Sequence, residues 1–455
     1  MKIQAIILAA GEGTRMKSTL PKVLHKAAGK TLLHHVTDTA AAARVNELLV
    51  VVGHGGEEVK KALPPEATPI LQEQQLGTGH AVQMAMNWID PQALVLVLCG
   101  DAPLLRPETL QSLVKYHREH RLDATVLSAN LSNPFGYGRI LRDDREALQG
   151  IVEEKDADNR RKAITEINSG TYCFRGQTLL DVLPGLSSDN RQQEYYLTDT
   201  LALIREMGGT IGAYCLQDPD EIRAVNSRAQ LAEVEALFRK RINQGHMDAG
   251  VTLVHPENTY IETGVTIGRD TVVEPGVILE GGTHIGQECR IGQNSRLTDT
   301  RVGDRVHITH STLCESTVDD DTTIGPYAYL RPGSQIGKRV RIGDFVEVKK
   351  SRIGDDSRAA HLAYIGDAQV GRHVNIGCGV VFVNYDGCKK EQTIVEDHAF
   401  IGSNANLVAP LTVSRGAYVA AGSTITKNVE ANSLAVARGR QRNIENWNST
   451  PAKEE

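Results

Sequence analysis

The chain has 455 residues, a formal net charge of −6, 40% hydrophobic and 23% charged residues, so it can bury the cores of two or three domains. The slight acidity argues against a nucleic-acid partner, and no apolar stretch approaches the roughly 18 residues of a membrane span. Seven scattered cysteines without a C-x-x-C pair indicate free thiols in a reducing compartment. We therefore expect a soluble cytoplasmic protein without membrane contact.

The first stretch with a chemical signature is IQAIILAAGEGTRMKSTLPK, residues 3–22. Residues 3–8 form an apolar run that predicts a strand, and the small residues 9–14 predict a tight turn whose amides can approach a phosphate. Arg15 and Lys22 add cationic side chains. The dinucleotide and P-loop fingerprints both fail here, because Met16 stands where each requires glycine. An ordinary strand-to-helix turn is the alternative.

Strand and helix signals alternate through the first half of the chain. Further strands are expected at residues 48–52 and 94–99, with helices at residues 32–43 and 80–88. Such alternation predicts an α/β domain with a mostly parallel sheet and helices on both faces. Ligands of such open sheets bind beyond the carboxyl ends of the strands. The opening loop and Asp101 both stand at such ends.

Two further features stand near those strand ends. Asp101 is a carboxylate where phosphates are expected, and Mg²⁺ prefers one or two carboxylates together with phosphate oxygens; the alternative is a helix N-cap before Pro103. The run from Gln72 to Gly77 and Thr78 supplies an amide and a glycine turn suited to the edge of a nucleobase. A bare turn explains that run equally well.

A helical pattern joins the two halves of the chain. Ser227 and Gln230 have the spacing of a capping box, apolar residues then recur with a 3.6-residue period to Ile242, and Gly245 is a stop signal. We expect this helix either to connect two domains or to pack on the first. The predicted parts are a first domain at residues 1–226, a helical linker at 227–250 and a second domain at 251–455.

From Ile261 onward an aliphatic residue recurs every six positions, for example at Ile267, Val273 and Leu279. A helix cannot give this period, because six residues rotate well away from the starting face. A hexapeptide repeat is the signature of a parallel β-helix, although the pattern does not define the hand of the coil. The break at residues 384–393, NYDGCKKEQT, predicts an inserted loop on one face, often the binding face of a solenoid.

Histidine 361 is the polar residue of the repeat best suited to chemistry. It stands in HLAYIGDA among cationic and amide residues, and an imidazole can accept a proton near neutral pH. The alternative is a surface histidine on a solenoid with a purely structural role. The polar tail from Ala437 to Glu455 is expected either to fray or to fold over a neighbouring subunit.

Taken together, these motifs resemble the bacterial bifunctional enzymes that make UDP-N-acetylglucosamine. The opening L-A-A-G-x-G-T-R-M string is similar to the signature of sugar-nucleotide pyrophosphorylases, and residues 3–226 follow the order of the uridylyltransferase domain. The resemblance implies a Rossmann-like nucleotidyltransferase fold with Mg²⁺ as cofactor. It assigns the UTP phosphates to Leu8, Ala9, Ala10, Gly11 and the catalytic Arg15 and Lys22, uracil to Gln72, Gly77 and Thr78, the sugar to Gly138, Glu153 and Asn168, and Mg²⁺ to Asp101 and Asn226, the latter also bordering the UDP-sugar.

The repeat resembles the acetyltransferase half of the same family through LRPG (330–333), VEVKK (346–350), HLAYIGDA (361–368), VNIG (374–377) and NYDG (384–387). The resemblance implies a left-handed prism that forms homotrimers, with His361 as the general base. It assigns glucosamine 1-phosphate to Arg331, Lys349, Tyr364, Asn375 and Lys390, and acetyl-CoA to Cys378, Asn384, Tyr385, Ser403, Ala421 and Arg438. Cys378 departs from the alanine expected there, and its thiol would make the site sensitive to alkylation.

The function implied by the resemblance has two steps. Glucosamine 1-phosphate is acetylated by acetyl-CoA, and the resulting N-acetylglucosamine 1-phosphate then receives UMP from UTP with release of pyrophosphate. The product would supply peptidoglycan and lipopolysaccharide synthesis. One alternative is a pyrophosphorylase with a single activity and a structural or regulatory β-helix. Another is a binding protein that keeps a degenerate pyrophosphorylase fold.

Overall fold

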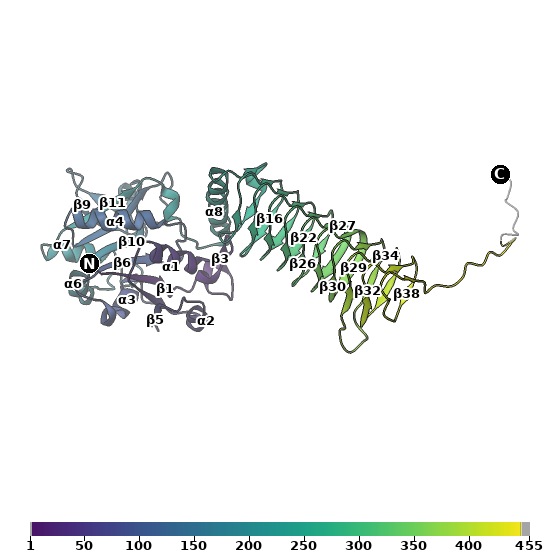
Figure 1. Ribbon diagram of the computed structural model, residues 1–455. Helices are drawn as coiled ribbons and strands as arrows, with labels where there is room; N and C mark the ends of the chain where they lie inside the picture. The colour runs from purple at the N-terminus through teal and green to yellow at the C-terminus, as the bar shows by residue number, and fades with distance from the viewer. Residues whose placement is uncertain (1, 446, 448–455) are drawn as a thin grey trace, which may run out of the picture. The chain divides into compact units, whose positions relative to one another are not determined.

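The computed structural model describes residues 2–445 and residue 447. The chain divides into two compact units between Phe238 and Arg239. The first unit contains a mixed sheet with helices, and the second is a coil of short strands (Figure 1). Part of the tail expectation, residues 448–455, lies outside the described residues.

The sheet of the first unit is built around β1, which lies between two other apolar strands. β1 (Ile3–Ala9) pairs in parallel with β4 (Glu47–Val52) and β6 (Leu94–Cys99). The strand order is β11-β7-β10-β6-β1-β4-β5, with a side hairpin of β8 and β9. Along this order four of the six pairs are parallel, but β10 runs antiparallel to β6, β7 and β8, and β8 to β9, so the sheet is more mixed than predicted. The remaining strands are β5 (Ala67–Leu71), β7 (Ala124–Asn130), β8 (Arg139–Arg142), β9 (Leu148–Val152), β10 (Glu166–Arg175) and β11 (Ile211–Leu216), and β2 (Lys26–Ala27) pairs separately with β3 (Lys30–Thr31).

Helices cover both faces of this sheet, as the alternation predicts. Successive β1 side chains point to opposite faces, so Ile7 packs in one cluster and Ile6 in another. The Ile7 cluster includes residues of α1, α2 and α4, and the Ile6 cluster includes residues of α3, α6 and α7. The helices are α1 (Leu32–Ala42), α2 (Gly56–Lys61), α3 (Thr78–Met84), α4 (Pro107–Glu119), α5 (Asn159–Lys162), α6 (Gly176–Val182) and α7 (Asp199–Glu206).

The connecting helix α8 spans Arg228–Asp248 and is longer than its signals predict. Its start agrees with the capping box, since the Ser227 hydroxyl accepts a hydrogen bond from the backbone N–H of Gln230 at 3.3 Å. Gly245 does not end the helix but lies inside its last turn. The helix contributes to both units: Phe238 stacks on His35 in the first, at 4.3 Å between ring centroids, and later residues pack on the core of the second.

The second unit is a prism of three strand ladders, which we call faces A, B and C. Face A runs through β12 (Thr252–Leu253), β15 (Val272–Val273), β18 (Arg290–Ile291), β21 (His307–Ile308), β24 (Thr323–Ile324), β31 (Asn375–Ile376), β34 (Phe400–Ile401), β37 (Tyr418–Val419) and β39 (Leu434–Ala435). Face B runs through β13 (Tyr260–Ile261), β16 (Ile278–Glu280), β19 (Arg296–Thr298), β22 (Thr312–Cys314), β25 (Tyr329–Leu330), β32 (Val381–Val383), β35 (Asn406–Val408) and β38 (Thr424–Ile425). The long strands β27 (Arg341–Lys349) and β29 (Arg358–Gly366) pass from face A to face B.

Face C is a separate sheet. It contains β14 (Thr266–Ile267), β17 (His284–Ile285), β20 (Arg301–Val302), β23 (Thr317–Val318), β26 (Gln335–Ile336), β28 (Arg352–Ile353), β30 (Ala368–Val370), β33 (Thr393–Val395) and β36 (Leu411–Val413). Three faces of six residues give the 18-residue spacing of the pair Ile261 and Leu279. Other coils are shorter, since Ile353 and Val370 are 17 residues apart. Val370 and Val395 are 25 apart, so the period breaks where the sequence predicts an inserted loop.

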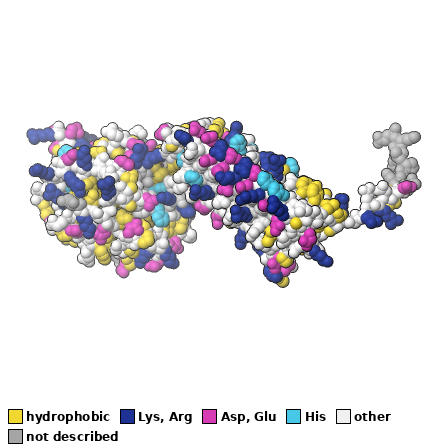
Figure 2. Space-filling view, in the orientation of Figure 1, with side chains coloured by type: hydrophobic (Ala, Val, Ile, Leu, Met, Phe, Trp, Pro, Cys, Tyr) yellow, Lys and Arg dark blue, Asp and Glu magenta, His cyan; other side chains and the backbone are white. Residues whose placement is uncertain are grey.

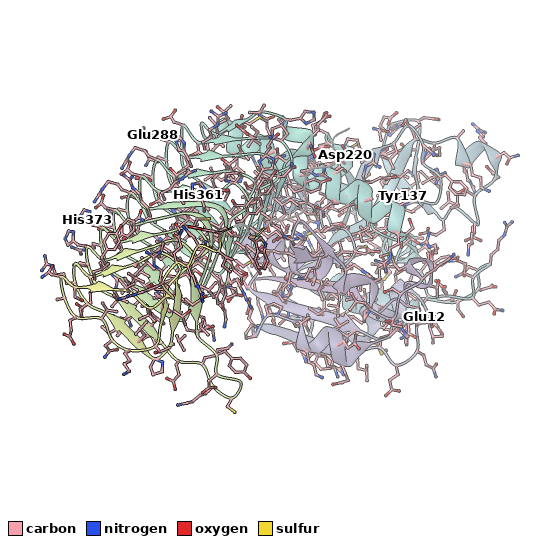
Figure 3. All side chains as sticks on the ribbon, turned by 90° about the vertical axis from the view of Figure 1, so that its right-hand side faces the viewer. Glu12, Tyr137, Asp220, Glu288, His361 and His373 are labelled. Carbon is pink, nitrogen blue, oxygen red and sulfur yellow. The ribbon has the colours of Figure 1, made fainter. Side chains whose placement is uncertain are left out.

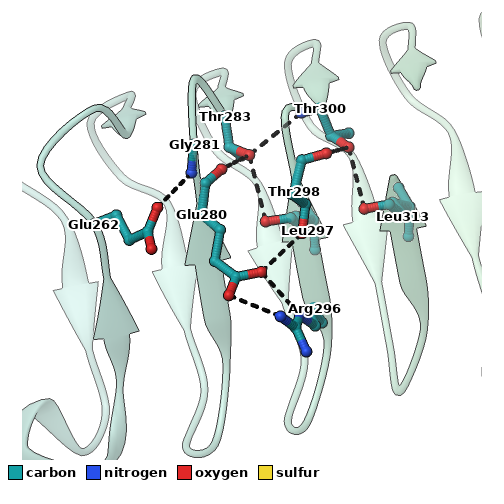
Figure 4. A network of polar contacts seen from close by, with 9 residues as sticks. All are labelled: Glu262, Glu280, Gly281, Thr283, Arg296, Leu297, Thr298, Thr300 and Leu313. Atoms are coloured by element: carbon teal, nitrogen blue, oxygen red, sulfur yellow. Dashed lines mark hydrogen bonds and ion pairs between the residues drawn. The ribbon is translucent and has the colours of Figure 1, made fainter. Parts of the chain in front are cut away.

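The core of the prism consists of the aliphatic residues that define the repeat, nearly all of them fully buried. Buried hydroxyls at the corners tie successive coils together (Figure 4). The Thr283 hydroxyl donates to the Glu280 carbonyl at 2.7 Å and accepts the Thr300 amide at 3.3 Å. Outside the core, Arg296 is paired with Glu280 at 2.8 Å. Each corner thus satisfies backbone groups that would otherwise be buried without partners.

Candidate functional sites

A cleft of about 280 Å³ lies beyond the carboxyl ends of β1 and β6. It collects predicted residues from four separate segments of the sequence. Small side chains after β1 leave room for a ligand close to the backbone. The predicted residues that line the cleft are Leu8, Ala9, Ala10, Gly11, Lys22, Gln72, Gly77, Thr78 and Asp101.

Lys22 is the centre of the polar contacts in this cleft. Its ammonium group forms an ion pair with Asp101 and donates a hydrogen bond to Asn226 Oδ1 at 3.0 Å. The side chains of Lys22 and Asp101 are only 14% and 16% exposed. Gly13, at φ +63°, leaves room for the Lys22 stem, because a Cβ there would lie 2.7 Å from Lys22 Cβ. The sequence analysis names all three residues but not these contacts, which join Lys22 to residues 79 and 204 positions further along the chain.

The same contacts test whether the site suits a divalent cation. The oxygens of Asp101 and Asn226 converge on one cationic group, so they can also face one metal ion. A carboxylate, an amide oxygen and ligand phosphates suit Mg²⁺. Within residues 2–445 and 447, no three His, Cys, Asp or Glu side chains form a metal-binding group. A metal here would therefore depend on ligand oxygens as well as on the protein.

Gln72 and Gly77 form the end of the cleft that the sequence assigns to uracil. Gln72 is buried, and its Nε2 donates to His80 Nδ1 at 2.9 Å and to the Gly77 carbonyl at 3.3 Å. Gly77 has φ +110°, and a Cβ there would lie 2.6 Å from the Tyr195 carbonyl oxygen. Only glycine fits this turn, which directly precedes α3. In the structure, the predicted helix at residues 80–88 is divided into α3 and a separate 3-10 turn at Met86–Trp88.

The predicted sugar residues form a second group beside the cleft. The backbone N–H of Asn168 donates to the Gly138 carbonyl at 2.9 Å, and a Cβ on Gly138 would lie 3.3 Å from Glu153 Oε2. Burial raises the pKa of Glu153, and a hydrogen bond from Thr198 partly offsets this. These three residues are brought together but do not line the cleft itself.

Arg15, the arginine predicted to bind the UTP phosphates, does not line the cleft. It lies on the short 3-10 turn Thr14–Met16, and its side chain is exposed. Met16 of the same turn is buried, so it serves as an apolar anchor where the glycine fingerprints require glycine. The catalytic role of Arg15 stays a prediction.

In the second unit, predicted acetyl-CoA residues form a column along the corner between faces A and B. His361, Cys378 and Ser403 each occupy the position before a corner residue in successive coils, and Ala421 follows in the next. The backbone pairs Gly379–Leu362, Asn404–Cys378 and Gly422–Ser403 fix this register. A ligand lying along this corner would meet one of these residues in each coil.

His361 has a partner that the sequence analysis does not identify. Its Nδ1 lies 2.7 Å from Asp344 Oδ1, directly opposite it in the preceding coil. The hydrogen bond from His361 holds the pKa of Asp344 below its usual range. Because a carboxylate only accepts, Nδ1 carries the hydrogen and Nε2 is left to accept a proton. The coil period could have identified this partner, because Asp344 stands one coil of 17 residues before His361.

A second polar group lies where face B meets the inserted loop. Asp367 Oδ2 contacts Lys349 Nζ at 3.5 Å and accepts from Asn384 Nδ2 at 2.5 Å. The adjacent Lys349 ammonium lowers the pKa of Lys390. Asn384 also approaches Tyr364 Oη at 3.5 Å. Two close ammonium groups repel each other and can attract an anion. Asp367 is the residue of this group that the sequence analysis misses.

The remaining predicted residues are more dispersed. Arg331 pairs with Glu347 at 2.9 Å, and Arg438 Nη1 donates to the Ala421 carbonyl at 3.0 Å. Tyr385 is exposed at the start of the inserted loop. Asn375 lies on face A, whereas Lys349 and Tyr364 lie on the face B part of their strands.

Parts of both units match known protein families. Residues 5–166 match the MobA-like NTP transferase domain. Residues 264–299 and 315–350 match the bacterial transferase hexapeptide family, and residues 392–427 match the hexapeptide repeat of succinyl-transferase. The chain is 60% identical to the "Bifunctional protein GlmU" of Alkaliphilus oremlandii, 57% to that of Alkaliphilus metalliredigens and 51% to that of Clostridioides difficile. These alignments cover 98% of this chain and 97–98% of each relative.

The chain belongs to the GlmU family of bifunctional proteins. Membership confirms the predicted fold, a Rossmann-like nucleotidyltransferase domain followed by a left-handed hexapeptide β-helix. It also confirms the predicted activity class: this GlmU-family chain is a bifunctional enzyme of UDP-N-acetylglucosamine synthesis, with nucleotidyltransferase and acetyltransferase functions that act on nucleotides and sugar phosphates. No helix among the described parts of the chain is long and apolar enough to cross a membrane.

Proposed function

We propose that the cleft of the first unit transfers UMP from UTP to N-acetylglucosamine 1-phosphate. The observation that carries this assignment is the contact of Lys22 with Asp101 and Asn226 at the mouth of the phosphate loop. The amides after β1 and the Lys22 ammonium would neutralise the UTP phosphates. Asp101 and Asn226 would hold Mg²⁺, which supplies further positive charge to the phosphates when bound.

In this proposal the protein acts by positioning and by electrostatics. Gln72 and Gly77 would hold the uracil, while Gly138, Glu153 and Asn168 would hold the sugar. The phosphate oxygen of the sugar then attacks the α-phosphorus of UTP and pyrophosphate leaves, so no covalent protein intermediate is needed. Lys22 would have to leave Asp101 in order to reach the phosphates.

We further propose that the prism acetylates glucosamine 1-phosphate. The observation that carries this step is the hydrogen bond between Asp344 and His361, which leaves His361 Nε2 free to take a proton from the sugar amine. The amine nitrogen attacks the thioester carbon of acetyl-CoA, and the CoA thiolate leaves. Lys349, Lys390, Arg331 and Tyr364 would bind the sugar phosphate. Cys378, Asn384, Tyr385, Ser403, Ala421 and Arg438 would contact acetyl-CoA.

Asn375 supports a homotrimer. It lies on face A, away from the face B residues proposed to share its ligand. A second copy of the chain that brings its own face A beside this face B would complete the site. We propose that three copies do so, that the functional parts are residues 1–226, 227–250 and 251–455, and that the enzyme works in the cytoplasm, where its product supplies peptidoglycan and lipopolysaccharide synthesis.

The test supplies glucosamine 1-phosphate, acetyl-CoA, UTP and Mg²⁺ and omits one component at a time. We expect thiol release without UTP, and pyrophosphate release only when UTP and Mg²⁺ are both present. His361→Ala should abolish thiol release while pyrophosphate release from UTP and N-acetylglucosamine 1-phosphate continues, and Lys22→Ala should do the reverse. Absence of thiol release in the unmodified enzyme would favour a pyrophosphorylase with a single activity. Loss of both activities in either variant would contradict two independent sites.

A further inference from the structure

Face C carries a cleft of about 400 Å³ that none of the proposed steps uses. It lies among the last coils of the prism, along β28, β30 and β33 and beside the turn that follows β36. Arg352, Arg372 and Arg415 line it together with Gln369 and Ile394. Three guanidinium groups from three different coils therefore face one concave surface.

Several arginines of the earlier coils form ion pairs, whereas these three form none with the residues that the structure describes. Arg290 pairs with Glu274 at 2.6 Å, Arg305 with Asp321 at 2.7 Å and Arg339 with Asp356 at 2.7 Å. Oppositely charged residues thus alternate along the outside of the prism, where Figure 2 shows dark blue and magenta side chains side by side. Within residues 2–445 and 447, no carboxylate forms an ion pair with the three guanidinium groups in the cleft, as is also true of Arg301, Arg341 and Arg358.

The two acidic residues that line the cleft have other hydrogen bonds. Asp397 Oδ1 accepts the backbone amide of Arg372 at 2.7 Å, and Glu396 Oε2 accepts the backbone amide of Arg415 at 2.8 Å. Asp356, the acid whose pKa Arg372 helps to lower, is already paired with Arg339. The lining contains three arginines and two acids, so it keeps one net positive charge.

The cleft is separate from the residues proposed for acetyl transfer. His361 belongs to the corner between faces A and B, whereas Arg372 precedes His373 at the corner between faces C and A. In Figure 3, His373 and Glu288 lie along one edge of the prism and His361 lies away from that edge. A ligand in the face C cleft would not occupy the corner column of His361.

We propose that the face C cleft binds a pyrophosphate group, either as the inorganic ion or as part of a small molecule. Guanidinium groups bind phosphate oxygens in pairs, and a diphosphate spans several of them. The partly buried Ile394 and the amide of Gln369 offer apolar and polar contacts to the rest of an organic ligand. The volume lies in the range of small-molecule sites.

The test measures the reactivity of individual arginines in the full-length protein. Phenylglyoxal modifies accessible guanidinium groups, and peptide mass spectrometry gives a rate for each arginine. We expect inorganic pyrophosphate to slow modification of Arg352, Arg372 and Arg415 by at least about fivefold, as a bound charge-assisted contact would. Arg301, an exposed arginine on the same face but outside the cleft, is the internal control and should change little.

Two comparisons make the test decisive. Sodium chloride at matched ionic strength should not protect the three arginines, since equal protection by salt would reduce the effect to screening and overturn the proposal. The double variant Arg352→Gln/Arg415→Gln should remove the protection of Arg372, while Arg301→Gln should leave it intact. Three arginines that never react would mean that another surface covers the cleft, and unchanged rates with pyrophosphate would mean that it binds none; either result overturns the proposal. Because pyrophosphate also reaches the uridylyl site, the readout is confined to these arginines and is independent of both activities.

Discussion

Replacement of Lys22 by methionine tests the polar contacts of the nucleotide cleft most directly. Methionine keeps the apolar stem that packs on Gly13 and removes only the charge. Asp101 would then keep a carboxylate that is 16% exposed and has lost its cationic partner. Removing one partner of a fully buried pair costs about 3–5 kcal/mol. Since this pair is not fully buried, we expect the first unit to lose about 2–3 kcal/mol of unfolding free energy.

That loss should be visible as a shift in thermal unfolding. For a unit of this size it corresponds to a fall in Tm of about 4–12 °C. Trp88 belongs to the first unit and reports its unfolding by fluorescence in a Trp447→Phe background. The matched control is Lys30→Met, because Lys30 pairs with Asp38 at 2.7 Å while both side chains are about half exposed. An exposed pair of this kind contributes at most about 1 kcal/mol.

Divalent cations and activity provide two independent checks of the same reasoning. Mg²⁺ should raise the Tm of Lys22→Met more than that of the unmodified protein, because no ammonium group competes for Asp101 and Asn226. Uridylyl transfer should fall at least about a hundredfold, as the loss of a major electrostatic contact does. Acetyl transfer should be unaffected. A variant as stable as the unmodified protein without Mg²⁺, or one with near-normal uridylyl transfer, would refute the role assigned to Lys22.

Three further predictions concern the prism. Asp344→Asn should lower acetyl transfer about 10- to 100-fold and change its pH profile, by analogy with supporting groups that orient a histidine; an unchanged profile would remove Asp344 from the site. Ser357→Ala should lower the unfolding free energy of the prism by about 1–3 kcal/mol in denaturant titration, because the buried hydroxyl donates to the Gly371 carbonyl at 2.8 Å and accepts the Val374 amide at 2.9 Å; an unchanged midpoint would contradict this. Arginine partners lower the pKa of Asp321 and of other paired acids of the prism. Their stabilisation is complete above the unfolded carboxyl pKa of about 4 and is lost as the pH falls through the lower folded values, so the Tm measured by circular dichroism should drop below pH 4, and less steeply in Asp321→Asn.

The elements of the first unit could be predicted where the apolar pattern is strong. The expected strand at residues 94–99 is the observed β6, because five of its six side chains are buried and only a buried strand tolerates such a run. The stop signal at Gly245 predicted the end of α8 too early, since the helix continues to Asp248. A glycine inside a helix is disfavoured by only about 1 kcal/mol, and the packing of Ile242 and Met247 on the prism core outweighs it.

The residues of the candidate sites also differ in whether local sequence patterns predict them. The loop after β1 could be found because its residues are consecutive, and Asp101 because it follows a buried strand, whereas Asn226 came from the resemblance. Asp344 and Asp367 could not be found from local patterns, since each meets its partner across coils. Such contacts become predictable only when the sequence is written out coil by coil, with the 16- to 18-residue registers aligned.

The corner column that begins at His361 sets a length scale for whatever lies along it. Neighbouring parallel strands are about 4.8 Å apart, and three coil steps separate His361 from Ala421. The column from His361 to Ala421 is therefore about 14 Å long. In the proposed acetyl transfer, acetyl-CoA would have to extend its arm over that distance to bring the thioester to the imidazole, so we predict that shorter thioesters gain little from the outer coils.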